Sequence, residues 1–492
     1  MLTKSDFLKF IQCPKALWLG KYRKDLIPEV TENQQVIFDN GYLVQEYAYK
    51  LFLEGINAIL ENGNFNEQLN HTRQLISKKT KVIYEATVAI KDLWCRADIL
   101  VYNESTSLYD LYEVKSGTSI KDENLYDITF QMIAFKESRV NIGNYNIIYI
   151  NNEYVKNGEI DPKGLLIVEN VNDRIKELEN ETRGKMDIAL SILDKKDIEP
   201  NVRILKQCNN PYECPFINYC WKNIPEESIY ELGKLSEETL NVLLDKNILL
   251  IKDIPEELLG DFRNILYYKT ITDINPIIDK EGIKEEIKKI KYPIYFIDYE
   301  TFSPVIPLID GYRPYQRIIF QYSLHIQRTP DSELEHHYFL AKELKDPTRE
   351  LAQSLKDLDD GNGSYISWNE VFEKGCNKEM GERDPMFTEY FKSVNDRMID
   401  LIIPFRKGYC WYREFKGSAS IKKVLPILVP KLSYSELDIH EGGTASNKWY
   451  EMVSEKTPQE EKDKIYNNLL TYCGLDTMAM VKILERLKII AE

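Results

Sequence analysis

Several features that would narrow the class of this protein are missing from its 492-residue sequence. No apolar run approaches the ~18 residues that a membrane-spanning helix requires, which argues against a helical membrane protein. The opening residues, MLTKSDFLKF, carry charges where a signal peptide has its apolar stretch, so the prediction is a cytoplasmic protein. Internal repeats and low-complexity tracts are also lacking.

An excess of basic residues is missing as well. The net charge is −15, which argues against a protein that coats nucleic acid with a uniformly positive surface. The same charge is compatible with an enzyme whose carboxylates hold metal ions and whose phosphate contacts are local. Hydrophobic residues make up 43% and charged residues 29% of the chain, the balance of a folded protein. The length predicts two or three domains.

Cysteine is scarce, with eight residues, and a reducing cytoplasm favours thiols or metal ligands over disulfides. Four of them form a pattern, one near the start and three close together much later: Cys13, Cys208, Cys214 and Cys220. The pattern lacks the C-x₂-C pairs typical of structural zinc sites. Four thiolates suit zinc or a 4Fe–4S cluster, and unliganded thiols are the third alternative. The other four are expected to be ordinary buried thiols: Cys95, Cys376, Cys410 and Cys473.

Hydrophobic patterning divides the chain into three parts: 1–222, 223–290 and 291–492. The first part is predicted to be an α/β domain with helices over 38–55 and 123–138 and strands over 81–90, 95–103, 107–117 and 145–151. The second is predicted to be a helical connector. The third is predicted to be another α/β domain, with strands over 294–302, 317–327 and 364–369 and an amphipathic helix over 467–488.

The first part contains a candidate catalytic constellation. Asp98 lies on a predicted strand, and Glu113 and Lys115 lie on the next one, where residues two apart point to the same face. Carboxylates can hold Mg²⁺ together with phosphate and water, and a lysine can orient water or neutralise developing charge. Glu85 could add a ligand, and Gln131 on the following helix could position water. These residues suffice for metal-assisted phosphodiester cleavage.

The setting of these residues resembles a known family. The stretches IQCPKALWLGKY, RADIL, YEVKSG and QMIAF, in this order and closed by the three late cysteines, resemble the RecB-like branch of the PD-(D/E)XK nucleases. The likeness extends to CRISPR-associated adaptation nucleases that carry an iron–sulfur cluster, and it covers residues 1–222.

This resemblance implies a role for each residue of the constellation. Asp98 and Glu113 would bind metal, Lys115 would be the catalytic lysine and Gln131 the motif glutamine. It also favours a 4Fe–4S cluster on Cys13, Cys208, Cys214 and Cys220. Two positions depart from the family: Gln45 stands where a metal-binding His is frequent, and Phe135 stands where Tyr is usual. Without the imidazole, weaker metal binding is expected, and the site could be slow or silent.

The third part contains a second constellation. Asp298 and Glu300 follow an apolar run and share one strand face, with Cα atoms about 6–7 Å apart. That spacing suits ligands around two metal ions, which lie ~3.5–4 Å apart in such enzymes. SWNEVFEKG adds Glu373, and TYCGLDT adds Tyr472 and Asp476, four residues apart on one helix face. A tyrosine and an aspartate so placed can position water over a metal.

These motifs together resemble the DEDD exonucleases of the DnaQ-like, ribonuclease-H-like fold, in the subtype with Tyr in the third motif. The resemblance covers residues 292–492. It implies Mg²⁺ or Mn²⁺ ions held by four acids, with Tyr472 orienting water: Asp298, Glu300, Glu373 and Asp476. Glu373 stands where Asp is usual, and Asp400 is a competing candidate for its role.

Residues 406–423, RKGYCWYREFKGSASIKK, alternate aromatic and basic side chains, which can stack on bases and hold phosphates. The candidate nucleic-acid contacts are Arg406, Lys407, Trp411, Arg413 and Lys416. A packed pair of strands with solvated flanks is the alternative. His440, in the predicted loop HEGGTASNK, is expected to be solvated rather than catalytic.

Both halves together resemble a bacterial family that fuses a RecB-like nuclease to a DnaQ-like domain. The resemblance implies a metal-dependent nuclease acting on nucleic-acid ends, with DNA as the expected partner and 3′→5′ exonuclease activity in the C-terminal domain. Two alternatives stay open. One is a non-catalytic nucleic-acid-binding scaffold, and the other is an RNase, because no residue is recognisable as a reader of the 2′-hydroxyl.

Overall fold

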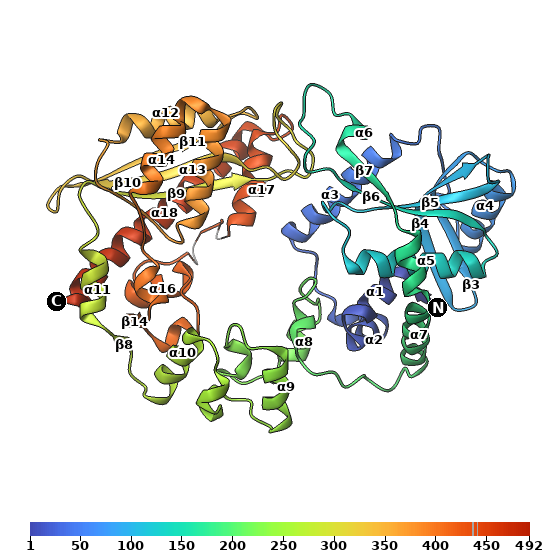
Figure 1. The fold of residues 1–492 in the computed structure, drawn as a ribbon, viewed down its shortest axis with the longest axis horizontal. Helices are drawn as coiled ribbons and strands as arrows, with labels where there is room; N and C mark the ends of the chain where they lie inside the picture. The colour runs from blue at the N-terminus through green and yellow to red at the C-terminus, as the bar shows by residue number, and fades with distance from the viewer. Residues whose placement is uncertain (435–436, 440) are drawn as a thin grey trace. The chain divides into compact units, whose positions relative to one another are not determined.

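The computed structural model describes residues 1–434, 437–439 and 441–492 (Figure 1), so His440 lies outside the described residues. The chain is mixed α/β and contains two compact units. The first comprises Met1–Asn223 and Pro304–Tyr315, and the second comprises Ile224–Ser303 and Gln316–Glu492. Across the described part of the chain, every helix is too short or too polar to cross a membrane.

The first unit is built on a mixed sheet in the order β2-β3-β4-β5-β6-β7, with β1 paired to β4. The bounds are β1 Leu2–Thr3, β2 Ile56–Asn57, β3 Val82–Ile90, β4 Leu93–Asn103, β5 Leu108–Val114, β6 Ile142–Ile150 and β7 Leu166–Asn170. Strands β3, β4 and β5 are antiparallel neighbours, whereas β6 runs parallel to β5. All four strands predicted for this part are present.

Helices complete the first unit: α1 Lys4–Gln12, α2 Pro14–Tyr22, α3 Glu32–Tyr49, α4 Phe65–Ser77, α5 Asp122–Glu137, α6 Pro162–Leu165, α7 Asn172–Asp194 and α8 Ile217–Trp221. Helix α5 is the crossover between β5 and β6, and its residues Phe130 and Phe135 are fully buried in the core. Pro304–Tyr315 also packs here, since the Tyr315 hydroxyl donates to the Ser116 carbonyl at 2.5 Å.

The second unit is built on a five-stranded sheet in the order β11-β10-β9-β12-β13. The bounds are β9 Ile294–Phe302, β10 Ile318–Gln327, β11 Leu334–Leu340, β12 Ser364–Ser367 and β13 Met398–Asp400. Strands β9, β10 and β11 are antiparallel, and β12 and β13 run parallel to β9. Its helices are α12 Thr348–Leu358, α13 Val371–Arg383, α14 Thr388–Asp396, α15 Ile403–Arg406, α16 Ile421–Leu428, α17 Gly442–Val453 and α18 Gln459–Ala491. The long α18, red in Figure 1, packs on β9 and β10.

The segment predicted as a connector belongs to the second unit. It contains α9 Glu237–Asp245, α10 Phe262–Thr272, β8 Ile277–Ile278 and α11 Lys280–Ile287. Strand β8 pairs with β14, Cys410–Trp411, and Lys407 Nζ donates to Glu286 Oε1 at 2.7 Å. These contacts join the segment to the C-terminal fold.

Candidate functional site

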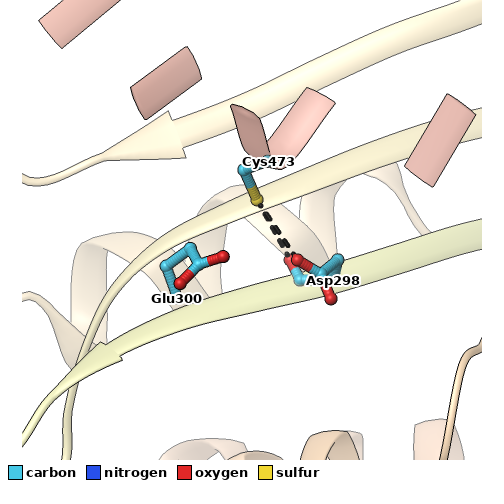
Figure 2. Close-up of side chains that lie close together, drawn as sticks. All are labelled: Asp298, Glu300 and Cys473. Atoms are coloured by element: carbon cyan, nitrogen blue, oxygen red, sulfur yellow. Dashed lines mark hydrogen bonds between the residues drawn. The ribbon is translucent and has the colours of Figure 1, made fainter. Parts of the chain in front are cut away.

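The second unit gathers acidic side chains from β9, α13 and α18. Asp298 and Glu300 project from β9, and Cys473 approaches them from α18 (Figure 2). One ligand atom from each of these three residues lies within 4.8 Å of the other two, the one such group found in the described part of the chain. The Cys473 thiol donates to Asp298 Oδ2 at 3.5 Å. We call Asp298, Glu300, Glu373 and Asp476 the β9 site.

The four acids of the β9 site are close enough to repel one another. Burial, followed by the charge of Asp476 and the other acids, raises the pKa of Asp298 and of Glu300 well above ordinary values. Burial also raises the pKa of Glu373 to about 8 and that of Asp476 to about 6. Oε2 of Glu373 is buried and has no hydrogen-bond partner among the described residues. Such a set of carboxylates can hold divalent cations.

Aromatic side chains and one lysine border the β9 site. Tyr472, one turn before Asp476 on α18, is buried, and Tyr434 donates its hydroxyl hydrogen to Asp476 Oδ1 at 2.5 Å. Lys422 Nζ lies 5.8 Å from the ring centre of Tyr434 and 5.9 Å from that of Tyr472. Its charge opposes the effect of burial on the pKa of Glu300. Sequence reasoning missed Tyr434, and it treated Cys473 as an ordinary thiol.

The structure separates the roles of the competing residues Glu373 and Asp400. Oδ1 of Asp400 accepts hydrogen bonds from the backbone N–H groups of Asn369 at 2.8 Å and Ile402 at 3.1 Å. These bonds hold the turn before α13, where Asn369 has a positive φ of 73°. Asp400 therefore supports the backbone, whereas Glu373 extends from α13 with one oxygen unpartnered among the described residues.

The basic stretch 406–423 is largely packed against its own unit. Trp411 is 0% exposed and contacts the Phe415 ring edge-on, so the prediction that this indole stacks on bases is wrong. Three of the predicted basic contacts are engaged with neighbouring side chains: Arg406 with Asn369, Lys407 with Glu286 and Arg413 with Glu227. Lys416 is exposed. Of the aromatic residues in the stretch, Trp411 and Phe415 are buried in the core, and Tyr409 and Tyr412 are half-buried.

The first unit brings together the four residues to which the PD-(D/E)XK resemblance assigns roles. Lys115 Nζ donates to Glu113 Oε1 at 2.6 Å, and Gln131 Nε2 donates to Glu113 Oε2 at 2.6 Å. The backbone N–H of Val114 donates to Asp98 Oδ2 at 2.7 Å. We call Asp98, Glu113, Lys115 and Gln131 the β5 site.

Two residues that contact the β5 site were missed by sequence reasoning. Asp127, one turn before Gln131 on α5, accepts from Lys115 Nζ at 2.6 Å. Lys4, the first residue of α1, donates to Glu113 Oε1 at 2.8 Å. The four-residue spacing of Asp127 and Gln131 was a usable signal, because such residues share a helix face. The sequence contains no comparable signal for Lys4.

Charge in the β5 site differs from that in the β9 site. Burial disfavours the charged form of Glu113, but the ammonium groups of Lys115 and Lys4 outweigh it and hold the pKa of this carboxyl well below its usual range. Burial and the nearby charge of Glu113 raise the pKa of Asp98 to about 7. The β5 site thus carries its own cations.

Gln45, one of the two positions that depart from the nuclease family, lies in a cluster of side chains near the β5 site. Gln45 Nε2 donates to Glu85 Oε1 at 2.5 Å, and the Tyr49 hydroxyl donates to the same oxygen at 2.8 Å. Arg96 lies 3.6 Å from the other oxygen of Glu85. Both oxygens of this carboxylate therefore have partners, and its role as a metal ligand stays a prediction. Phe135, the second departure, is a core residue.

The four patterned cysteines come from both ends of the first unit. Cys13 separates α1 from α2, Cys208 ends a short turn, and Cys220 lies on α8. Cys13 and Cys220 pack in the same cluster of side chains as Cys214, whose backbone N–H donates to the Cys208 carbonyl at 2.8 Å. Burial raises the pKa of Cys214 to about 11. The remaining four cysteines are buried, as predicted: Cys95, Cys376, Cys410 and Cys473.

Comparison with known proteins adds a family match but no described activity. Residues 295–420 match the family described as "Domain of unknown function (DUF2779)", a range that includes Asp298, Glu300 and Glu373 but ends before Tyr472. The chain is 25% identical over 220 residues to "Uncharacterized protein MG366" of Mycoplasma genitalium, covering 41% of this chain and 32% of that protein. It is 23% identical over 285 residues to "Uncharacterized protein UU173" of Ureaplasma parvum, covering 53% and 41%. The chain therefore spans less than half the length of these relatives.

Proposed function

We propose that the protein is a metal-dependent nuclease, a phosphodiester hydrolase whose main catalytic centre is the β9 site. The observation that carries this proposal is a set of four mutually repelling carboxylates, three of them buried and Asp298 half-buried, with an unpartnered oxygen on Glu373 among the described residues. Buried acids of this kind are stabilised by cations, and Mg²⁺ and Mn²⁺ prefer oxygen ligands. The four acids would hold such ions.

The fold of the second unit supports the same proposal. Its three antiparallel strands are followed by two strands parallel to β9, and the first two acids lie on β9 at the centre of the sheet. This arrangement agrees with the ribonuclease-H-like fold that the sequence motifs imply. Helix α18 then adds Tyr472 and Asp476 from the opposite end of the domain sequence.

The residues around the acids suit the hydrolysis of a strand end. Bound metal ions would supply an activated water and charge to stabilise the leaving oxygen. The Tyr472 hydroxyl, one turn from Asp476, would orient the attacking water. Lys422 places a positive charge beside Glu300 and Asp476, where it would attract a substrate phosphate. We propose a 3′→5′ exonuclease with DNA as its substrate.

The β5 site is proposed as a second nucleic-acid site of the PD-(D/E)XK type, in which Asp98 and Glu113 would hold metal. One observation favours binding over cleavage there. Both oxygens of Glu113 already accept hydrogen bonds from lysine or amide groups, so a metal ion would have to displace one of them.

For the four cysteines we propose a 4Fe–4S cluster that fastens α8 to the first helices. Cys13 and Cys220 pack in the same cluster of side chains as Cys214. The family resemblance favours the iron–sulfur cluster over zinc.

The nuclease proposal is tested with end-labelled single- and double-stranded DNA and RNA in Mn²⁺. Asp298→Ala and Asp476→Ala should each slow the release of nucleotides from 3′ ends by about a thousandfold, because each removes a metal ligand. Glu370→Ala is the matched control, since Glu370 precedes α13 and pairs with Lys374. Wild-type rates in both variants would refute the assignment of the β9 site. Binding without any release by the wild-type protein would favour a scaffold, and release from RNA alone would favour an RNase.

A further inference from the structure

Lys4 contributes a cation to the β5 site from outside the motif that defines it. Its Nζ lies 2.8 Å from Glu113 Oε1 and 3.6 Å from Asp127 Oδ1. Both carboxylate side chains are 2% exposed, and the Lys4 side chain is 18% exposed. The ammonium group therefore occupies the edge of a buried acidic pair.

The backbone around Lys4 is fixed by the core of the unit. Leu2 and Thr3 form β1 and pair with Leu93 and Trp94 of β4, the strand that also carries Asp98. Thr3 caps α1 by accepting a hydrogen bond from the backbone N–H of Asp6 at 3.0 Å. Lys4 is thus placed by strand pairing and helix capping, and its position is built into the fold.

At Glu113, the Lys4 ammonium group would compete with a metal ion for a carboxylate oxygen. Its Oε1 accepts from Lys4 and Lys115, and its Oε2 accepts from Gln131. Mg²⁺ needs a carboxylate oxygen at about 2.0–2.1 Å, and two cations at one oxygen repel each other. In the β9 site, by contrast, Glu373 Oε2 has no hydrogen-bond partner among the described residues.

We propose that Lys4 is an internal counter-ion that weakens divalent-metal binding at the β5 site and keeps this site inactive until the ammonium group is displaced from Glu113. The inference rests on the proposed metal role of the β5 site. It assigns Lys4 a regulatory function distinct from that of Lys115, which lies on the motif itself and also bonds Asp127.

The test measures Mn²⁺ binding by electron paramagnetic resonance and calorimetry in the full chain carrying Asp298→Ala and Asp476→Ala, which disable the β9 site. Adding Lys4→Met, which keeps the aliphatic stem and removes the charge, should tighten Mn²⁺ binding by about tenfold. Lys9→Met on the same helix is the control, because Lys9 lies 3.8 Å from Asp6 and should leave the affinity unchanged. A further Glu113→Gln change should abolish the gain.

Equal Mn²⁺ affinity with and without Lys4→Met would overturn the inference alone. No binding in either protein would overturn it together with the metal role of the β5 site, while the β9 site would still stand on its nuclease assay. If Lys4→Met does not fold in chelator, recovery of cooperative melting with Mn²⁺ supports the inference, and a protein that stays unfolded overturns it. Lys4→Gln, which keeps a donor without the charge, is measured beside it.

Discussion

At the scale of single residues, Tyr434 is an uncharged hydrogen-bond donor to an acid of the β9 site. Burial raises the pKa of Asp476 to about 6, and the hydrogen bond from Tyr434 limits that rise. Tyr434→Phe removes the bond and should raise this pKa further, so that less of the carboxylate is ionised below neutral pH. We expect nuclease rates below about pH 7 to fall roughly tenfold, with the acidic limb of the pH–rate profile moved upward.

The matched control for this prediction is Tyr450→Phe. Tyr450 lies on α17, is 42% exposed and stacks on Phe302 at 5.0 Å, so removal of its hydroxyl leaves the acids untouched. An acidic limb that stays in place in Tyr434→Phe would show that the hydroxyl does not tune Asp476.

Glu373 should make the metal-free protein sensitive to pH. Burial raises its pKa from 4.5 to about 8, so over that range the folded protein holds a proton that the unfolded chain has lost. The resulting stability is complete below the unfolded pKa and is lost as the pH rises toward the folded pKa. Each pH unit within this window lowers the free energy of unfolding by up to about 1.4 kcal/mol.

Glu373→Gln isolates this contribution because glutamine does not titrate. In chelator, the melting temperature of the wild-type protein should fall relative to that of Glu373→Gln between about pH 5 and about pH 8. Mn²⁺ should raise the wild-type value most at the alkaline end, where the carboxylate is ionised. Parallel melting curves across this range would contradict the burial of an unpaired Glu373 carboxylate.

At the scale of elements, local patterns predicted strands more accurately than helix ends. The strand expected over 294–302 is β9, because aromatic and β-branched residues run without interruption up to Asp298 and Glu300. The helix expected over 38–55 is α3, which instead begins at Glu32, where Thr31 and Gln34 form a capping box. The helix expected over 467–488 is part of the longer α18.

Contacts between distant elements were beyond sequence reasoning. Lys4 and Glu113 are 109 residues apart, and α1 reaches the acidic pair through the pairing of β1 with β4 and the stacking of Phe7 on Phe130. The prediction that Trp411 contacts nucleic acid was wrong for a related reason. Its strand, β14, pairs with β8, which lies in the distant segment predicted as a connector. Motif residues on one strand or helix could be predicted, whereas their partners from other elements could not.

At the scale of the whole molecule, the two compact units contain sites with different charge balance. The β9 site has four acids that repel one another, and the β5 site has lysines in contact with its acids. The acidic residues of this chain, whose net charge is −15, therefore lie in two different electrostatic environments. If the proposed function is correct, we expect added metal to act mainly on the second unit, because the acids of the β5 site already have lysine partners.

The proposed iron–sulfur cluster leads to a prediction for the intact protein. Protein purified without oxygen should be brown and contain about four irons per chain. Cys214→Ala should abolish the colour and lower the melting temperature of the first unit, because Cys214 packs with Trp18, Phe216 and Cys13 and the cluster would join these elements. Cys95→Ala, which removes a fully buried thiol elsewhere in the unit, should keep the iron. Colourless protein with one zinc per chain would contradict the cluster, and loss of iron in both variants would show that unfolding, not ligand removal, is responsible.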